Sequence, residues 1–253
     1  MIGRLLGRLI GKPERPAIPD ALWQATIAGL PFIARLAPAD LARLRALTDA
    51  FLASKEFTTA GELELDDRIC LTIAVQACLP ILNLGLGWYD DWVGIVVYPD
   101  EFVIPRSIQD ADGIVHEYDE PASGEAWGGG PVLVSWRDVR MASDGYNVVI
   151  HEFVHKLDMR NGDADGVPPL PTRAARQRWE EVLFAAYDDF CAEVDAAEAR
   201  GEDTEIDPYA SENPGEFFAV LAEAFFETPE LVAGRFPLLY AQFTGFFRLD
   251  PRA

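Results

Sequence analysis

The sequence has few cysteines, few histidines and few basic residues. Its 253 residues include 3 cysteines, 3 histidines, and 21 lysines and arginines against 42 aspartates and glutamates, so the formal net charge is −21. This excess of negative charge repels phosphate backbones and anionic lipid surfaces, which argues against a nucleic-acid-binding or membrane-surface protein. Cationic or neutral partners fit the charge better.

Cysteine spacing and hydrophobic run length exclude further classes. Cys70, Cys78 and Cys191 form neither a disulfide framework nor a CxxC pair, so we expect core thiols in a reducing compartment. No window approaches the roughly 18 consecutive apolar residues of a membrane span, and no signal-peptide cleavage site follows residues 1–12. The sequence therefore predicts a cytoplasmic protein without a membrane span.

The hydrophobic pattern changes twice along the chain. Apolar residues at helical spacing mark 20–29, 38–54 and 66–79, and short β-branched and aromatic runs broken by Pro and Gly fill 92–136. Helical spacing returns over 146–160, 173–199, 213–227 and 236–248. This order predicts an α+β fold with a small central mixed sheet and flanking helices. We expect an N-terminal arm or linker over 1–20 and a single domain over 21–253, whose section from about 21 to 85 is helical.

The most informative motif is His151-Glu152-x-x-His155. On a helix, residues four apart share a face, so both imidazoles can chelate one zinc ion while Glu152 lies beside them. Catalytic zinc keeps an open position for water and lowers the water pKa from about 15.7 to about 7, so Glu152 is the predicted base. The alternative is two satisfied polar histidines on a helix surface. Two of the only three histidines fall at this spacing, and their neighbours are apolar. Both observations favour a metal site over the polar alternative.

The third metal ligand has several candidates. His116 lies in an acidic, strand-like stretch and is expected on the surface. A metzincin is excluded, because Asp158 and Asn161 occupy the positions of its glycine and third histidine. A carboxylate is then expected, and Glu216 in the helix over 213–227 is the best one.

The alternative for Glu216 is a capping box with Asn213 at the helix start. Glu223 lies seven residues later on the same face and is expected to be an outer hydrogen-bond partner of a ligand, whereas Glu212 is a weaker rival for the metal. Asp158 lies seven residues after His151 on the same face and is a candidate to orient a ligand histidine as an outer hydrogen-bond acceptor. Tyr209 is a candidate to stabilise an oxyanion.

The run from Asn147 to Pro168, followed by Ile206–Ala210 and Pro214–Leu221, resembles the Mlc titration factor A family of bacterial zinc peptidases. The resemblance covers nearly the whole chain. It implies zinc, one ion per chain, bound by His151, His155 and Glu216, with Glu152 as the catalytic base and Tyr209 at the active site. It also implies a zincin-like fold related to the catalytic domain of anthrax lethal factor, a cytoplasmic location and aminopeptidase-type activity.

The same resemblance implies binding of Mlc, a glucose-regulated transcriptional repressor, in addition to a peptide substrate. We therefore expect a zinc-dependent peptidase. The alternative is a regulatory protein that sequesters a transcription factor and in which zinc is structural or vestigial. If the chain is a peptidase, a strand within 131–136, just before the zinc helix, is expected to pair with extended substrate, and substitutions at Val132 or Val134 that block pairing should raise KM.

Overall fold

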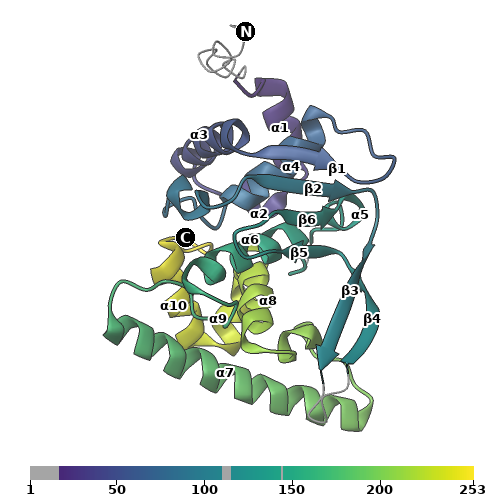
Figure 1. Ribbon diagram of the computed structural model, residues 1–253. Coiled ribbons are helices and arrows are strands. Elements are labelled where there is room, and N and C mark those ends of the chain that lie inside the picture. The colour runs from purple at the N-terminus through teal and green to yellow at the C-terminus, as the bar shows by residue number, and fades with distance from the viewer. Residues whose placement is uncertain (1–16, 110–114, 144) are drawn as a thin grey trace, which may run out of the picture.

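The computed structural model describes residues 17–109, 115–143 and 145–253 and has an α+β fold (Figure 1). The predicted α+β class is confirmed. Most of the N-terminal arm predicted over 1–20 lies outside the described residues. The elements are α1 (Asp20–Ala28), α2 (Pro31–Ala34), α3 (Pro38–Ser54), β1 (Glu56–Thr59), α4 (Asp67–Cys78), η1 (Leu86–Tyr89), β2 (Gly94–Tyr98), β3 (Phe102–Gln109), β4 (Val115–Ala122), β5 (Gly124–Ala126), β6 (Val132–Ser135), α5 (Trp136–Val139), α6 (Val148–Asp158), η2 (Met159–Asn161), α7 (Arg173–Arg200), η3 (Pro208–Ser211), α8 (Pro214–Glu227), α9 (Pro229–Arg235) and α10 (Pro237–Phe247).

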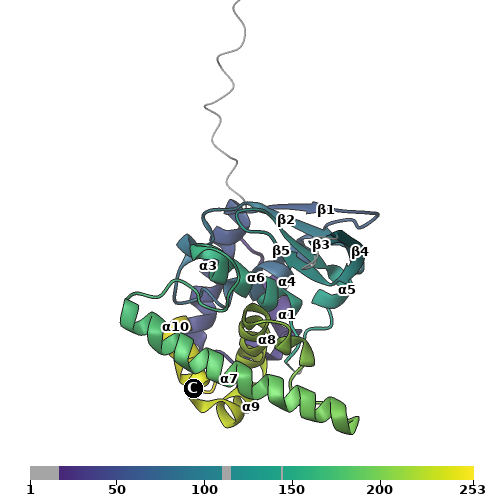
Figure 2. The same cartoon turned by 60° about the horizontal axis from the view of Figure 1, so that its bottom comes forward.

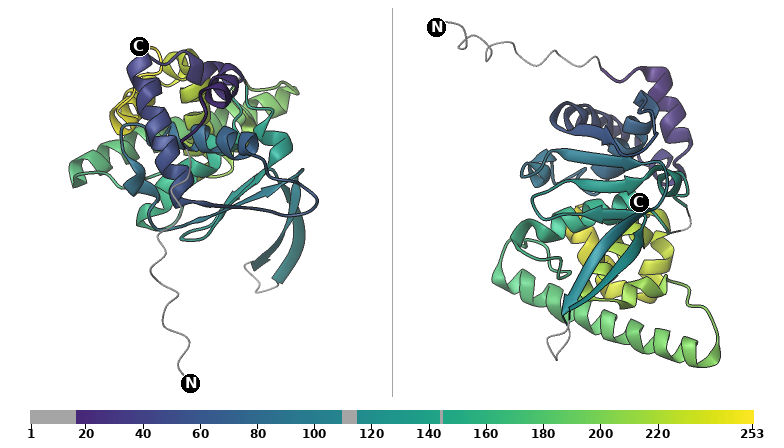
Figure 3. Two further views of the ribbon diagram at one scale, coloured as in Figure 1. Left: turned by 90° about the horizontal axis from the view of Figure 1, so that it is seen from above. Right: turned by 45° about the vertical axis from the view of Figure 1, so that its right-hand side comes forward.

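The described strands form two sheets. The larger is a mixed sheet in the order β1-β2-β6-β5, with β1, β2 and β6 parallel and β5 antiparallel to β6. The smaller is the antiparallel pair β3–β4, which extends away from the main sheet beside the helices (Figure 3). The mixed central sheet was predicted; the division into two sheets was not.

Strand β1 interrupts the section that the sequence predicts to be helical over 21–85. It pairs in parallel with β2, and helix α4 connects the two strands. The segment has four residues, of which only Phe57 is partly buried. Because so short an edge strand buries almost nothing, it shows no alternating hydrophobic pattern that sequence analysis could detect.

Strand β6 has no edge open to substrate. Its residues pair with β2 on one side and with β5 on the other, and all four are buried. The prediction that the 131–136 strand pairs with substrate is therefore wrong. A run of consecutive apolar residues is typical of a central strand with both faces covered, and in this part of the sheet β5 is the edge strand.

Aromatic packing fixes the helices that follow the sheet. Helix α8 is buried along nearly its whole length, and helix α7 crosses in front of it in Figure 2. Phe218 and Phe225 of α8 contact Phe243 of α10 with ring centroids 5.4 and 5.7 Å apart. Within the described residues, no helix is both long and apolar enough to span a membrane.

Candidate metal centre

The helices α6 and α8 each begin at an asparagine cap. The Oδ1 atom of Asn147 accepts a hydrogen bond from the Ile150 amide at 3.0 Å, and the Oδ1 atom of Asn213 accepts one from the Glu216 amide at 3.0 Å. Such caps satisfy amide groups that the first helical turn leaves unpaired. The first turn of α8 thereby holds Glu216 opposite the histidines of α6.

Three candidate ligand atoms form a nearly equilateral triangle. The Nε2 atom of His151 lies 2.9 Å from Glu216 Oε2, the two Nε2 atoms are 3.1 Å apart, and His155 Nε2 lies 3.2 Å from Glu216 Oε2. A tetrahedral zinc ion with bonds of about 2.0–2.1 Å holds its ligands about 3.3 Å apart. The structure thus brings all three predicted ligands together in a group that can hold a metal ion.

The hydrogen bonds of His151 favour a positive charge within this group. Its Nδ1–H donates to Glu223 Oε1 at 2.7 Å, so Nε2 is the ring nitrogen that faces a carboxylate oxygen and a second imidazole nitrogen. Burial opposes protonation of His151, but the carboxylates of Glu216 and Glu223 outweigh it and raise its pKa well above the usual value. The group is therefore stabilised by positive charge between these atoms, which either a proton on His151 Nε2 or a bound metal ion supplies.

Glu216 lies in the capped first turn of α8 and also belongs to the ligand group. Its amide bonds to the Asn213 side chain, as the capping alternative requires, but its carboxylate contacts His151 and His155. Although burial opposes ionisation, the two imidazoles hold the pKa of Glu216 well below its usual range. The weaker rival, Glu212, follows η3 outside this group.

The outer hydrogen-bond partner of His151 comes from α8. Asp158 Oδ2 accepts a hydrogen bond from the Gly166 amide at 2.7 Å and fixes the loop after α6, whereas Glu223 is the acceptor for His151. Asp158 therefore does not bond to His151, whereas the position of Glu223 agrees with its expected role as an outer hydrogen-bond partner of a ligand. Glu223 reaches His151 because α8 packs across α6.

A buried polar network around Asn147 was missed by sequence analysis. The Asn147 amide donates to Glu223 Oε2, and its side-chain Nδ2 donates to Gln76 and Glu227 at 2.8 Å each. Glu227 also accepts from the Gly145 amide at 3.0 Å. The network links α4, α6 and α8 behind His151. One signal was present in the sequence, since Glu227 lies one helical turn after Glu223.

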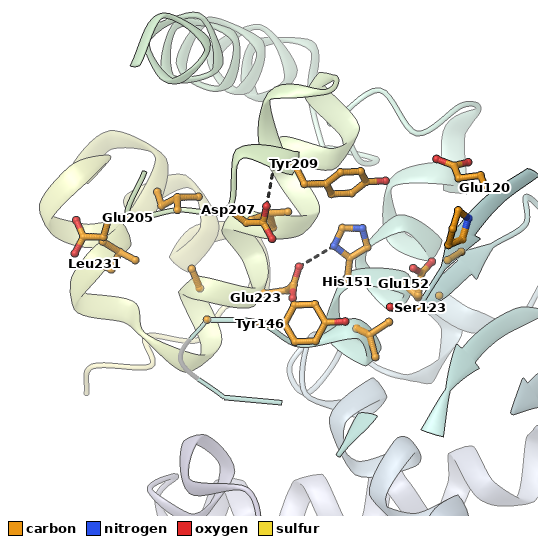
Figure 4. Close-up of a pocket in the computed structure, with 18 residues that line it drawn as sticks. Glu120, Ser123, Tyr146, His151, Glu152, Glu205, Asp207, Tyr209, Glu223 and Leu231 are labelled. Atoms are coloured by element: carbon orange, nitrogen blue, oxygen red, sulfur yellow. Dashed lines mark hydrogen bonds and ion pairs between the residues drawn. The ribbon is translucent and has the colours of Figure 1, made fainter. Parts of the chain in front are cut away.

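Glu152 and Tyr209 reach the same cavity of about 370 Å³ (Figure 4). Glu152 is only 5 % exposed, and burial raises its pKa to about 7. The Tyr209 ring lies 6.1 Å from the His151 ring between centroids, and its hydroxyl points across the cavity. Burial and the Glu216 carboxylate raise the Tyr209 pKa, so the phenol keeps its proton at neutral pH.

The cavity lining is acidic. It contains Glu120, Glu152, Glu205, Asp207 and Glu223, and it contains no lysine or arginine among the described residues. His116, the third histidine, lies in strand β4 in register with Ile108, and the expectation that it is a surface residue concerns a side chain outside the described part of the structure. The cavity therefore favours a ligand with positive charge.

Comparison with known proteins gives a consistent assignment. The family described as Glucose-regulated metallo-peptidase M90 matches residues 9–248. The chain is 42% identical over 236 residues to Mlc titration factor A of Salmonella arizonae (strain ATCC BAA-731 / CDC346-86 / RSK2980), covering 92% of each chain. It is 41% identical over 239 residues to Mlc titration factor A of Enterobacter sp. (strain 638), covering 92% of this chain and 88% of the relative. With a match over nearly its whole length and a group of residues that can hold a metal, this chain belongs to the glucose-regulated metallo-peptidase M90 family.

Proposed function

We propose that this chain is a zinc-dependent peptidase of the aminopeptidase type, with one zincin-like domain over 21–253. The triangle of His151 Nε2, His155 Nε2 and Glu216 Oε2 carries the proposal. Two imidazole nitrogens and one carboxylate oxygen suit zinc, and three protein ligands are the number that a catalytic site uses. A zinc ion held there supplies Lewis-acid activation of a water molecule and of the scissile carbonyl.

The chain's own residues then move the protons. Glu152, buried beside the histidines with a pKa of about 7, takes a proton from the attacking water and passes it to the leaving amine. Tyr209 remains a phenol at neutral pH, and its hydroxyl donates a hydrogen bond to the developing oxyanion. These roles match the ring contact with His151 and the direction of the hydroxyl in Figure 4.

Substrate lies along the edge strand and across the acidic cavity. Strand β5 is the edge of the mixed sheet and borders the cavity through Gly124. A peptide that pairs with this edge presents its main chain to Glu152, which packs against the same strand. The carboxylates of the lining favour the free ammonium group of a substrate N-terminus.

The test is hydrolysis of chromogenic aminoacyl and N-blocked peptidyl substrates by zinc-loaded wild-type protein and by Glu152→Gln, with metal content measured in both. We expect zinc at one per chain in both proteins and a kcat lower by about 10²–10⁴-fold in the variant. Full activity in Glu152→Gln would remove Glu152 as the base. No hydrolysis by zinc-loaded wild-type protein of any substrate in the panel would reject the peptidase.

A second function is binding of a Mlc-like repressor. The relatives carry the name Mlc titration factor A, and the match extends over 92% of this chain. A cytoplasmic location is part of this proposal, because a transcriptional repressor acts there. Capture of purified Mlc by Glu152→Gln, with and without zinc, tests whether binding is independent of catalysis. Capture by an inactive wild type would favour the regulatory alternative, and no capture by either protein would reject it.

A further inference from the structure

Gly124, the first residue of strand β5, lies directly against the side chain of Glu152. A Cβ atom on Gly124 would lie 2.4 Å from Glu152 Oε1, 2.6 Å from Cγ and 2.8 Å from Cδ. These separations are shorter than any van der Waals contact, and they involve the last three groups of the side chain. The Glu152 carboxylate therefore occupies space that exists only because residue 124 has no side chain.

The backbone does not require glycine at this position. Seven described glycines have a positive φ, and Gly124 is not one of them. It pairs in ordinary antiparallel register with Val134 of β6. Since an L-residue can adopt this backbone conformation, the contact with Glu152 is the feature that restricts position 124 to glycine.

Strand β5 cannot easily move away from α6. At its start, the carbonyl of Ser123 accepts a hydrogen bond from the Ser135 amide at 2.7 Å. At its far end, the buried Lys156 of α6 donates to the carbonyls of Trp127 and Gly130 at 2.6 and 3.1 Å. The helix that carries Glu152 thus also holds the turn after β5. A methyl group at 124 would displace the Glu152 side chain before it displaced the strand.

We propose that Gly124 is a positioning residue for Glu152, whose carboxylate is held against the bare backbone of the edge strand and so kept at the metal-facing side of the cavity. The inference rests on the proposed peptidase function for its kinetic consequence. Its steric part concerns the fold alone and is testable without activity. Gly124 acts through Glu152, and its amide backbone remains available to pair with a substrate.

The first test is Gly124→Ala, with Gly128→Ala as the matched control in the same β5–β6 segment. A Cβ at Gly128 meets only Met159 Sδ at 3.8 Å, and this glycine also lacks a positive φ. We expect Gly124→Ala to bind zinc at one per chain and to lose about 100-fold in kcat with little change in KM, because a displacement of about 1 Å costs about that factor. Gly128→Ala is expected to keep wild-type kinetics. A wild-type kcat in Gly124→Ala would overturn the proposal.

A double-mutant comparison separates positioning from general damage to the strand. In the Glu152→Gln background, which has lost its base, Gly124→Ala is expected to cause no further loss of residual kcat. A further loss of the same factor in that background would show that Gly124 acts by another route, and the proposal would be wrong. If zinc-loaded wild-type protein hydrolyses nothing, the peptidase fails and this comparison is replaced by the stability cycle.

The stability cycle uses Glu152→Ala and needs no substrate. Overpacking by a methyl group is expected to lower the Tm of Gly124→Ala by about 5 °C. In the Glu152→Ala background the methyl group has free space, so the same substitution is expected to lower Tm by less than about 1 °C. If Gly124→Ala alone does not fold, the double variant with Glu152→Ala is examined. Folding of the double variant supports the clash with Glu152, and its failure to fold contradicts it. An equal loss in both backgrounds would show that the methyl group meets something other than Glu152.

Discussion

The cavity has one wall of helices and one wall of strands, and the helical wall is buried and hydrogen-bonded whereas the strand wall is more exposed. On the helical wall, α6 and α8 are tied by buried hydrogen bonds through Asn147 and Glu223, and α8 is packed among aromatic rings. The strand wall consists of the end of β4 and the start of the three-residue edge strand β5. The β3–β4 pair behind it is open to solvent, with Val103 and Tyr118 58 % and 46 % exposed.

This difference separates two tasks. A metal site needs ligands held within a few tenths of an ångström, which buried and mutually satisfied polar groups provide. A site that takes varied peptides needs unpaired backbone and adaptable surface, which an edge strand provides. Substitutions on the helical wall should therefore change metal affinity and stability, and substitutions on the strand wall should change substrate kinetics.

The largest effect is expected from Glu216→Gln. Loss of a ligand charge leaves the two imidazoles without their carboxylate and should weaken metal binding by more than the roughly 10–100-fold typical of an outer hydrogen-bond partner. Metal competition with a chromogenic chelator measures the change. Glu212→Gln, outside the ligand group, is the control and should bind metal as the wild type does. Equal affinity of the two variants would contradict the assignment.

The next effect is expected from Glu223→Gln. The amide can still accept from His151 Nδ1–H, but it no longer raises the basicity of that imidazole as a carboxylate does. Metal affinity should fall by about 10–100-fold while the three ligands remain in place. Glu230→Gln on the surface of α9 is a suitable control. An unchanged affinity in the chelator competition would show that Glu223 has only a structural role.

Two asparagine helix caps with hydrogen bonds of equal length test how much the buried network adds to stability. Asn147→Ala removes a cap and the two buried hydrogen bonds that its Nδ2 donates to Gln76 and Glu227, so it should lower the free energy of unfolding by about 2–4 kcal/mol. Asn213→Ala removes an exposed cap of the same length and should cost about 1 kcal/mol. Denaturant titration of both variants measures the difference. Equal costs would mean that the network behind His151 adds nothing to stability.

The smallest effect is expected on the acidic rim of the cavity. Glu205→Gln should lower the ratio of kcat/KM for a lysyl substrate to that for its neutral norleucyl counterpart by about 1.5–5-fold, since an exposed charge pair contributes little. The effect should fade at high salt, where exposed charges are screened. Glu198→Gln, outside the cavity lining, is the matched control. If Glu205→Gln leaves the ratio unchanged and Glu198→Gln lowers it, the preference for charged substrates does not come from the cavity lining.

The ligand group was predictable to a large extent because its parts are local. His151, Glu152 and His155 share one helical turn, and Glu216 and Glu223 share one face of the next long buried helix. Helical geometry alone puts each set on one side of its helix. The same geometry also puts Asp158 on the face of His151, and nothing local shows that Glu223 is the carboxylate that bonds to His151.

The features that sequence analysis missed depend on contacts between distant segments. Strand β1 forms only by pairing with β2, and the edge of the sheet falls on β5 because β6 is covered on both sides. The contact of Gly124 with Glu152 joins residues 28 positions apart, so no spacing rule points to it.

The sequence by itself determined the α+β class, the zinc-type motif and the carboxylates that accompany it, because helical and strand periodicity and a motif within one turn are local properties of the chain. Only the tertiary structure decided which carboxylate holds His151, which strand offers an edge to substrate and why residue 124 is glycine. Those choices depend on how α8 crosses α6 and how β5 lies against α6, and the physical reason is that packing between elements selects among side chains that local geometry leaves equivalent.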